Sequence, residues 1–509
     1  MNKSSKYVDK IRSTNVYDVA IVTPITEASG LSESYGNNIL LKREDLQPVF
    51  SFKVRGAYNK ISKLYAKGVK KPIMAASAGN HAQGVAYAAK RLKLKATIVM
   101  PVTTPSIKVD SVKKFGAKVL LHGDSFDEAF SFAKNLSQES DAVFIHPYDD
   151  VDVIAGQGTV GMEIMDKLEG NVDAVFVPVG GGGLLAGVGA YIKSINPKIK
   201  VYGVEPDDAA CLDAALKAKK RVKLKEVGLF ADGVAVKQIG KNTFDVISEW
   251  VDGVVTVSVD EMCAAVQDTF QETRTIPEPA GALALAGLKK LTKIRGWKNK
   301  TLVAINSGAN LNFDRLSHIV ERVQLGENKE ALFSVEISEE KGSFRRFCKS
   351  LGKRMISEFN YRVDNKKEAN IFVACRFSKG KEEKKELLTD LKEKGYSPID
   401  LSDNEVAKLH VKHMVGGRAP ESVIKNGELL FRVRFPEKPG ALINFLDNLS
   451  DDWNITLFHY RNQGAAYGRV LVGFQAKPSE KNKLIKQLKQ LGYPFWDETG
   501  NVAYSAFLE

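Results

Sequence analysis

Residues 179–187 of the chain read VGGGGLLAG. Four consecutive glycines follow the apolar run Ala174–Val179 and lead into a stretch whose apolar residues have helical spacing. A strand, a glycine turn and a helix in this order expose backbone N–H groups at a helix N-terminus, where phosphate binds well. The loop matches neither GxxxxGK[ST] nor GxGxxG. It therefore predicts a phosphate site of another kind, with a plain flexible loop as the alternative.

Short apolar runs alternate with helical patterns on both sides of this loop, from residue 1 to residue 325. Such alternation is typical of α/β proteins in which helices cover both faces of parallel sheets. Ligands bind at the carboxyl ends of the strands in these sheets. The predicted strands are Ile73–Ala76, Ala96–Pro101, Lys118–His122, Ala174–Val179, Val201–Val204 and Leu302–Ile305. The predicted helices include His81–Leu92 and Ser106–Phe115.

The segment SFKVRGA (Ser51–Ala57) places Lys53 between aromatic and β-branched neighbours. Burial in such a setting disfavours the charged amine and lowers its pKa. A partly deprotonated lysine can form a Schiff base. A lysine in an apolar run is more often a surface residue whose amine reaches water, so that alternative stays open for this segment alone.

The segment SAGNHAQG (Ser77–Gly84) directly follows a predicted strand. Its small residues let the backbone approach an anion closely, and Ser77 and Asn80 add polar side chains. We expect this turn to hold a carboxylate or a phenolic oxygen. A tight turn in which Asn80 caps the next helix is the simpler alternative.

The segment NSGANLN (Asn306–Asn312) follows the last predicted strand of this region. Ser307 therefore belongs at the carboxyl end of a strand, close to the same edge as the other segments. Its hydroxyl can donate a hydrogen bond to a ring nitrogen. An N-cap role for Ser307 competes with this interpretation.

In their order and spacing, these four segments resemble the fold-type II pyridoxal-phosphate (PLP) enzymes. Within that group, the chain is similar to the biosynthetic threonine dehydratases (threonine ammonia-lyases) over nearly its whole length. The resemblance implies PLP as cofactor and L-threonine as substrate, with L-serine second. It implies α,β-elimination to 2-oxobutanoate and ammonia, the first step of isoleucine biosynthesis.

The resemblance also implies roles for single residues. Lys53 would bind the cofactor as a Schiff base and then act as the general base. Asn80 would contact the 3′-oxygen of PLP, and Ser307 would contact its pyridine nitrogen. The phosphate would be cradled by Gly180, Gly181, Gly182, Gly183 and Leu184. The substrate carboxylate would be received by Ser77, Ala78, Gly79 and His81.

Two positions depart from the related serine racemases. Those enzymes have a second acid/base serine where this chain has Ala78, so we expect little racemisation. They also bind a divalent metal through an acidic triplet, whose positions here hold Glu205, Ala209 and Cys211. We therefore predict no metal site, and we interpret residues 205–208 as a turn with solvated charges.

After residue 325 the chain repeats itself once. EEKGSFRRFCKSLGKRMISEFNYR (339–362) aligns with EKPGALINFLDNLSDDWNITLFHYR (437–461), so that Gly342 matches Gly440. Each copy reads as strand, helix, strand, strand, helix and predicts a βαββαβ unit of the ferredoxin-like kind. The predicted domains are a PLP-dependent catalytic domain at 1–325 and two ACT-like regulatory domains at 326–409 and 410–509.

By the same resemblance, the two ACT-like domains sense isoleucine, often with valine opposing, and the enzyme is a homotetramer. Feedback of this kind requires that the effector bind two states of the enzyme differently. The loops Gly342–Ser343 and Pro439–Leu442 begin helices and could take an amino-acid carboxylate. We favour a site between the copies; inert packing domains are the alternative.

Composition excludes several classes of protein. Hydrophobic residues make up 44% of the 509 residues, which is too much for a disordered chain. The net charge of +13 is spread along the chain, so we expect no nucleic-acid binding. Four distant cysteines predict neither disulfides nor a zinc site. The first residues lack the apolar stretch of a signal peptide, and we predict a cytoplasmic protein without a membrane span.

Two other functions remain open at this point. One is a different PLP enzyme, such as a serine dehydratase, a threonine synthase or a cysteine synthase, although the duplicated C-terminal part argues against it. The other is a non-catalytic amino-acid sensor with a degenerate PLP fold. The presence of Lys53, Asn80, the glycine loop and Ser307 argues against the sensor.

Overall fold

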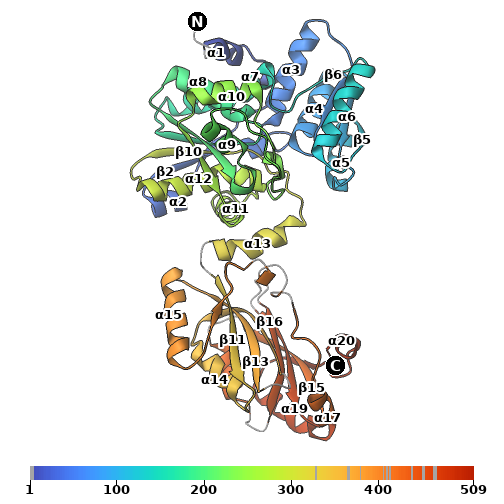
Figure 1. Cartoon of the computed structure of the whole chain (residues 1–509), viewed down its shortest axis with the longest axis vertical. Helices are drawn as coiled ribbons and strands as arrows, with labels where there is room; N and C mark the ends of the chain where they lie inside the picture. The colour runs from blue at the N-terminus through green and yellow to red at the C-terminus, as the bar shows by residue number, and fades with distance from the viewer. Residues whose placement is uncertain are drawn as a thin grey trace. The chain divides into compact units, whose positions relative to one another are not determined.

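The computed structural model divides the chain into two compact units, Met1–Val323 and Gln324–Glu509 (Figure 1). Each unit is described by itself. The residues described are 5–326, 330–363, 367–378, 380–404, 406–407, 411, 414–436, 440–449, 453–461 and 467–508.

The first unit contains a six-stranded sheet in the order β1-β2-β10-β7-β8-β9. All neighbouring strands are parallel except β1, which runs antiparallel to β2 at the edge. The strands are β1 (Ile25–Glu27), β2 (Asn38–Arg43), β7 (Ala174–Pro178), β8 (Lys200–Pro206), β9 (Gly253–Val257) and β10 (Thr301–Asn306).

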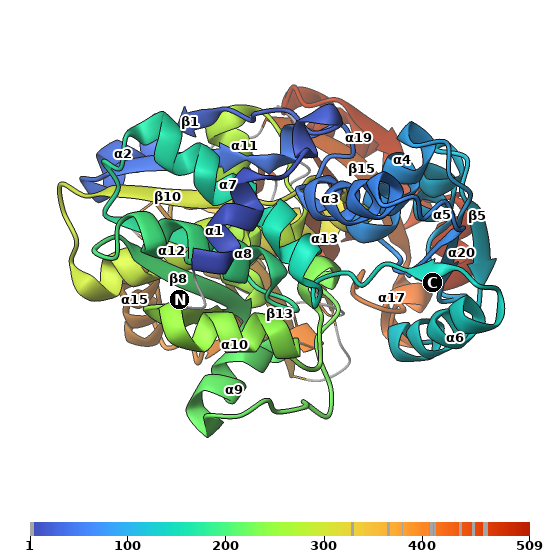
Figure 2. The same cartoon turned by 90° about the horizontal axis from the view of Figure 1, so that it is seen from above.

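A second sheet of this unit has four parallel strands in the order β5-β4-β3-β6. With α3 to α6 it forms a lobe beside the larger sheet (Figures 1 and 2). Its strands are β3 (Ile73–Ala76), β4 (Ala96–Met100), β5 (Lys118–Leu121) and β6 (Val143–Phe144). The α/β prediction is confirmed, and the six predicted strands are present to within two residues at each end.

Helices cover both faces of the large sheet, as its apolar strands require. Val175 and Val177 of β7 pack into a core with α7 and α8, whereas Ala174 and Phe176 pack into a core with α11 and α12. The helices of this unit are α1 (Ser5–Arg12), α2 (Ser29–Tyr35), α3 (Lys53–Ala66), α4 (Asn80–Arg91), α5 (Ser106–Lys113), α6 (Phe126–Glu139), α7 (Val151–Leu168), α8 (Gly183–Ile195), α9 (Cys211–Ala218), α10 (Lys241–Trp250), α11 (Val259–Thr273), α12 (Pro279–Arg295) and α13 (Arg315–Gly326).

The second unit is built on one eight-stranded antiparallel sheet in the order β14-β11-β13-β12-β16-β17-β15-β18. Each copy of the repeat supplies four neighbouring strands in the ferredoxin-like order, which confirms the predicted α+β fold. The first copy contains β11 (Glu330–Ser338), α14 (Ser343–Ser350), β12 (Met355–Arg362), β13 (Glu368–Arg376), α15 (Lys381–Glu393) and β14 (Ile399–Asp400). The second contains β15 (Glu428–Pro436), α18 (Ala441–Asp447), β16 (Asn454–Arg461), β17 (Tyr467–Gln475), α19 (Lys481–Gln490) and β18 (Phe495–Asp497). Two short helices, α17 (Glu421–Asn426) and α20 (Val502–Phe507), flank the second copy along the chain.

The two copies meet where β12 pairs with β16. Asn360 lies opposite His459, and these residues occupy the same position in the two repeats. One hydrophobic core extends through both copies and includes the packed rings of Phe344, Phe359 and Phe458. The copies are therefore two halves of one sheet. The predicted boundary between residues 409 and 410, like Pro439 of the predicted effector loop, lies outside the described residues.

Within the described part of the chain, no helix is long and apolar enough to cross a membrane. The four cysteines are buried and free of disulfides.

Candidate active site

Lys53 is the first residue of α3 and is half-buried. Its amine donates a hydrogen bond of 3.1 Å to the carbonyl oxygen of Pro147. Burial disfavours the charged amine and lowers the pKa of Lys53 to about 8, although the carboxylate of Glu278 partly opposes this shift. Lys53 is therefore an interior amine with a substantial neutral fraction near pH 8, not a surface lysine with its amine in water.

The glycine loop lies between β7 and α8 and has no room for side chains. A Cβ on Gly181 would come within 2.2 Å of the Tyr148 ring, and one on Gly182 within 2.7 Å of Ile239. Gly182 also has a φ of +88°, which favours glycine. The first N–H groups of α8, which begins at Gly183, have no partner within the helix and remain available to an anion. Because Tyr148 follows the carbonyl group that receives Lys53, the loop and the amine lie in one region.

Asn80 is the first residue of α4, and Gly79 is the N-cap of that helix without a side-chain cap. The amide of Asn80 donates to Glu278 at 2.5 Å and accepts from Asn310 at 2.6 Å. Asn80 therefore does not cap its helix, and the simpler alternative for this residue is excluded. The helix also brings Asn80 close to Lys53, because Gly84 packs against the Lys53 backbone and a Cβ there would lie 3.1 Å from it.

Ser307 follows β10 and is 4% exposed. Its hydroxyl donates to the carbonyl oxygen of Ala280 at 3.2 Å, at the start of α12. Its own carbonyl oxygen accepts from the N–H of Phe52 at 3.3 Å, directly before Lys53. The next helix begins only at Arg315, so Ser307 is not its N-cap. This hydrogen bond therefore brings Ser307 next to the segment that contains Lys53.

The predicted carboxylate site lies in the turn before α4. Ser77 accepts a hydrogen bond of 3.2 Å from the N–H of Gly79. A Cβ added to Gly79 would meet no protein atom within 4 Å, so the space beside this turn is open. Ala78 lies in the same turn and adds no polar side-chain atom.

His81, in contrast, faces the protein interior and is 3% exposed. Its Nε2 lies 3.0 Å from the carbonyl oxygen of Ile145 and must donate, because that oxygen can only accept. Burial lowers the pKa of His81 to about 3, so the ring is neutral and its Nδ1 carries no proton. The His81 side chain therefore offers a carboxylate no donor, and only its backbone N–H can contribute.

Glu205 corrects one sequence prediction. It is fully buried at the end of β8, and its oxygens accept hydrogen bonds from the backbone N–H groups of Leu212 and Asp213 at 2.8 and 2.9 Å. Burial raises its pKa to about 7. The prediction of solvated charges is wrong for Glu205, because its carboxyl group holds the start of α9. Among the residues that the structure describes, no cluster of His, Cys, Asp and Glu could hold a metal ion.

Three residues of the site were not found from sequence. Tyr148 packs against the glycine loop, while Glu278 and Asn310 bind Asn80 from segments 198 and 230 residues away. Glu278 stands between two prolines before α12, a pattern that marks a helix start but gives no sign of its partner. Asn310 lies inside the NSGANLN segment, but its position in that segment does not distinguish it from the neighbouring residues as a site residue.

The arrangement fits a phosphorylated aromatic aldehyde such as PLP. The glycine loop can receive a phosphate, Lys53 is a partly neutral amine, and Asn80 and Ser307 offer donors to ring atoms. A loop in which a Cβ on Gly181 or Gly182 would clash is the observation that favours a backbone cradle for a phosphate group.

Comparison with known proteins agrees with this chemistry. Residues 16–308 match the pyridoxal-phosphate dependent enzyme family. Residues 321–411 and 421–508 match the C-terminal regulatory domain of threonine dehydratase. A biosynthetic L-threonine dehydratase of Burkholderia multivorans is 48% identical over 508 residues, which is 99% of each chain. That of Escherichia coli is 50% identical over 506 residues, or 99% of this chain and 98% of the other.

Solved structures resemble the chain as well. Processed threonine deaminase isoform 2 of Solanum lycopersicum aligns with a TM-score of 0.62 and 47% identity, covering 64% of this chain and 89% of that protein. Serine racemase of Dictyostelium discoideum aligns with a TM-score of 0.56 and 34% identity, covering 60% of this chain and 98% of that protein.

Proposed function

Because the chain belongs to the biosynthetic threonine dehydratases, a family of PLP-dependent lyases, we propose that it deaminates L-threonine with Lys53 as its cofactor-binding lysine. The observation that carries this assignment is the half-buried amine of Lys53, whose pKa is lowered to about 8. The products are 2-oxobutanoate and ammonia. L-Serine, which lacks only the γ-methyl group, is the expected second substrate.

The residues around Lys53 divide the work of holding the cofactor. When bound, PLP supplies the electron sink that weakens the bond between the α-carbon and its hydrogen. The N–H groups of Gly180–Leu184 and the dipole of α8 would hold the phosphate. Asn80 would donate to the ring oxygen, and the Ser307 hydroxyl, which donates to the Ala280 carbonyl oxygen, would donate to the ring nitrogen instead.

Lys53 also moves the proton in this account. A neutral lysine amine can accept the α-proton of the substrate, and its lowered pKa keeps a large neutral fraction near pH 8. The substrate carboxylate lies against the open turn at Ser77–Gly79, which orients the α-carbon. Ala78 supplies no second acid on this turn, so elimination of the β-hydroxyl is favoured over inversion of the α-carbon.

The test is a 2-oxo-acid assay with L-threonine on the purified protein and on Lys53→Ala. We expect the variant to lose about 10²–10⁴-fold in rate, the usual contribution of a general base. Lys67→Ala, at the exposed end of the same helix, is the matched control and should keep full activity. Wild-type protein that makes no 2-oxobutanoate would overturn the proposal.

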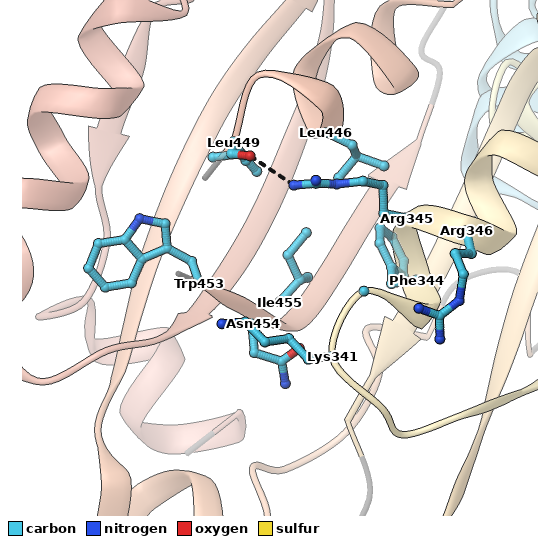
Figure 3. A pocket seen from close by; sticks show the side chains of 10 residues that line it. Lys341, Phe344, Arg345, Arg346, Leu446, Leu449, Trp453, Asn454 and Ile455 are labelled. Atoms are coloured by element: carbon cyan, nitrogen blue, oxygen red, sulfur yellow. Dashed lines mark hydrogen bonds between the residues drawn. The ribbon is translucent and has the colours of Figure 1, made fainter. Parts of the chain in front are cut away.

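For regulation, the proposed effector is isoleucine and the proposed site is a cavity of about 390 Å³ between the two copies (Figure 3). The first copy contributes the start of α14, and the second contributes the end of α18 and the start of β16. A carboxylate can meet the cationic side chains, and a branched aliphatic side chain can meet the apolar wall. The lining residues used in this argument are Lys341, Arg345, Arg346, Leu446, Leu449 and Ile455.

The first copy supplies the cationic side chains that line this cavity. Arg345 donates a hydrogen bond of 2.8 Å to the Leu449 carbonyl oxygen, which holds its side chain over the cavity (Figure 3). The repeat positions that match Arg345 and Arg346 hold Ile443 and Asn444, which carry no charge. The two arginines that could meet a carboxylate in this cavity therefore come from the first copy.

An isoleucine titration of activity tests this site. For Arg345→Met we expect the half-inhibiting concentration to rise about tenfold, the loss of one charge-assisted hydrogen bond. Lys385→Met, an exposed lysine of α15, is the control and should leave it unchanged. An unchanged half-inhibiting concentration in Arg345→Met would contradict the assignment of this cavity as the effector site. A wild-type activity that does not change with isoleucine would contradict the proposed feedback inhibition itself. The same titration with valine measures its opposing effect.

The homotetramer and the cytoplasmic location stay predictions. Light scattering of the purified protein measures the first, and cell fractionation measures the second.

A further inference from the structure

The amide group of Asn80 is held in one orientation by its neighbours. The amide nitrogen of Asn310 lies 2.8 Å from the carbonyl oxygen of Val49 and 2.6 Å from the Asn80 amide. Because the Val49 oxygen can only accept, the group of Asn310 that faces it must be the NH₂. That NH₂ donates its second hydrogen to Asn80, so the atom of Asn80 on this side must be the oxygen.

This order fixes the other end of the Asn80 amide. Its NH₂ faces Glu278 and donates a hydrogen bond of 2.5 Å to Oε1. This oxygen accepts the bond and therefore carries no proton. Glu278 is 4% exposed, and a Cβ on Gly308 would lie 2.5 Å from the same oxygen. The carboxyl group is thus fixed in place by packing. One hydrogen of the Asn80 NH₂ is taken by Glu278, and the second remains.

We propose that Glu278 and Asn310 are positioning residues that hold Asn80 so that its remaining N–H, and not its oxygen, faces the ring oxygen of the cofactor. The inference rests on the proposed function, in which Asn80 meets that oxygen. Without Asn310, only Glu278 would oppose exchange of the two ends of the amide, and a protonated Glu278 could donate to the amide oxygen instead. An Asn80 turned the other way would place an acceptor against the ring oxygen and repel it.

Asn310 adds an electronic effect to this orientation. Its hydrogen bond to the Asn80 oxygen strengthens the N–H donors at the other end of the amide, because a chain of hydrogen bonds polarises its members. Burial and the neighbouring Asp232 raise the pKa of Glu278 to about 7, whereas Asn80, Lys108 and Lys53 oppose that shift. Whichever protonation state it has, Oε1 can still accept from Asn80, so the orientation persists across this pH range.

The test uses the full-length apoenzyme and PLP itself. Asn310→Ala and Glu278→Leu should each weaken PLP binding about tenfold, the effect of losing one well-placed hydrogen bond, and shift the absorbance maximum of the bound cofactor. Glu278→Gln keeps an accepting oxygen and should stay within about threefold of wild type. Affinity is read from quenching of protein fluorescence, which does not depend on activity.

Asn312→Ala is the matched control, because the Asn312 side chain bonds only to the local N–H of Asp314 among the contacts described. Melting temperatures identify any variant that fails to fold, and the Asn310→Ala and Glu278→Gln results stand independently of Glu278→Leu. Wild-type affinity and absorbance in a folded Asn310→Ala protein would overturn the inference. Failure of the wild type to bind PLP at all would instead overturn the proposed function.

Discussion

Each unit of the molecule contains a buried arginine that bonds to glutamate. Arg55 of the catalytic unit is fully buried and bonds to Glu44 at 2.8 Å and to Glu163 at 2.6 Å. Arg362 of the C-terminal unit is 7% exposed and bonds to Glu428 at 2.7 Å. In both clusters, a planar guanidinium makes bidentate contacts that a lysine could not reproduce.

The two clusters differ in what they join. Arg55 lies two residues after Lys53 and ties the start of α3 to α7 and to the segment after β2. Arg362 ends β12 of the first copy, whereas Glu428 begins β15 of the second and also accepts from Tyr504 of α20. The first cluster therefore fixes the element that carries the reactive amine. The second fixes the junction of the two copies, where β12 pairs with β16.

Loss of the first cluster gives the largest effect that we expect. Arg55→Met leaves the buried Glu44 and Glu163 without their guanidinium partner and with Lys42 as the remaining cation of the cluster. Loss of one partner of a buried pair costs about 3–5 kcal/mol. The free energy of unfolding of the catalytic unit should fall by the upper end of that range, and 2-oxobutanoate production should fall with it. Urea unfolding at constant PLP measures the change. An unchanged urea midpoint and full activity in Arg55→Met would contradict the claim that this cluster fixes the helix that carries Lys53.

Arg362→Met tests the second cluster and should give a smaller effect, near 3 kcal/mol, because one carboxylate is left unpaired. The loss should appear in the C-terminal unit and as a weaker response to isoleucine. Exposed Arg418→Met is the control. Two-transition calorimetry separates the units. A shift confined to the catalytic transition would show that Arg362 does not act at the junction between the copies.

The smallest effect concerns Glu205 of the catalytic unit. Because its pKa is raised from 4.5 to about 7, its stabilising contribution is complete below pH 4.5 and is lost as the pH rises through 7. The difference in free energy of unfolding between the wild type and Glu205→Gln should therefore decrease by about 1–3 kcal/mol between pH 5 and pH 8. Urea midpoints at both pH values measure it, and a difference that grows with pH would contradict the shift.

Sequence reasoning reached the buried parallel strands most reliably. Ile73–Ala76 is apolar throughout, as a strand covered on both faces must be, and its limits are as predicted. β2 was not predicted, because its sequence NILLKR ends in two cations that resemble surface residues. In the structure both are buried and bonded, Lys42 to Glu163 and Arg43 to Asp45. Only the tertiary arrangement supplies those partners.

The candidate site also contains residues that local sequence locates and residues that only the tertiary structure reveals. Lys53, Asn80, the glycine loop and Ser307 follow strands in short motifs, so local sequence locates them. Glu278 and Asn310 are defined only by their bonds to Asn80, which span 198 and 230 residues. The sequence repeat predicted two ferredoxin-like copies. It gave no sign that β12 and β16 would pair and merge them into one sheet, because strand pairing between copies leaves no periodic signal.

The central claim is that Lys53 is the lysine that binds the cofactor. The most direct measurement is borohydride reduction of the PLP-loaded protein, followed by digestion and mass spectrometry of the peptides. The account predicts that the pyridoxyl group is found on the peptide that contains Lys53, and that Lys53→Ala carries none. A pyridoxyl group on a different lysine of the wild type, or on none, would contradict it.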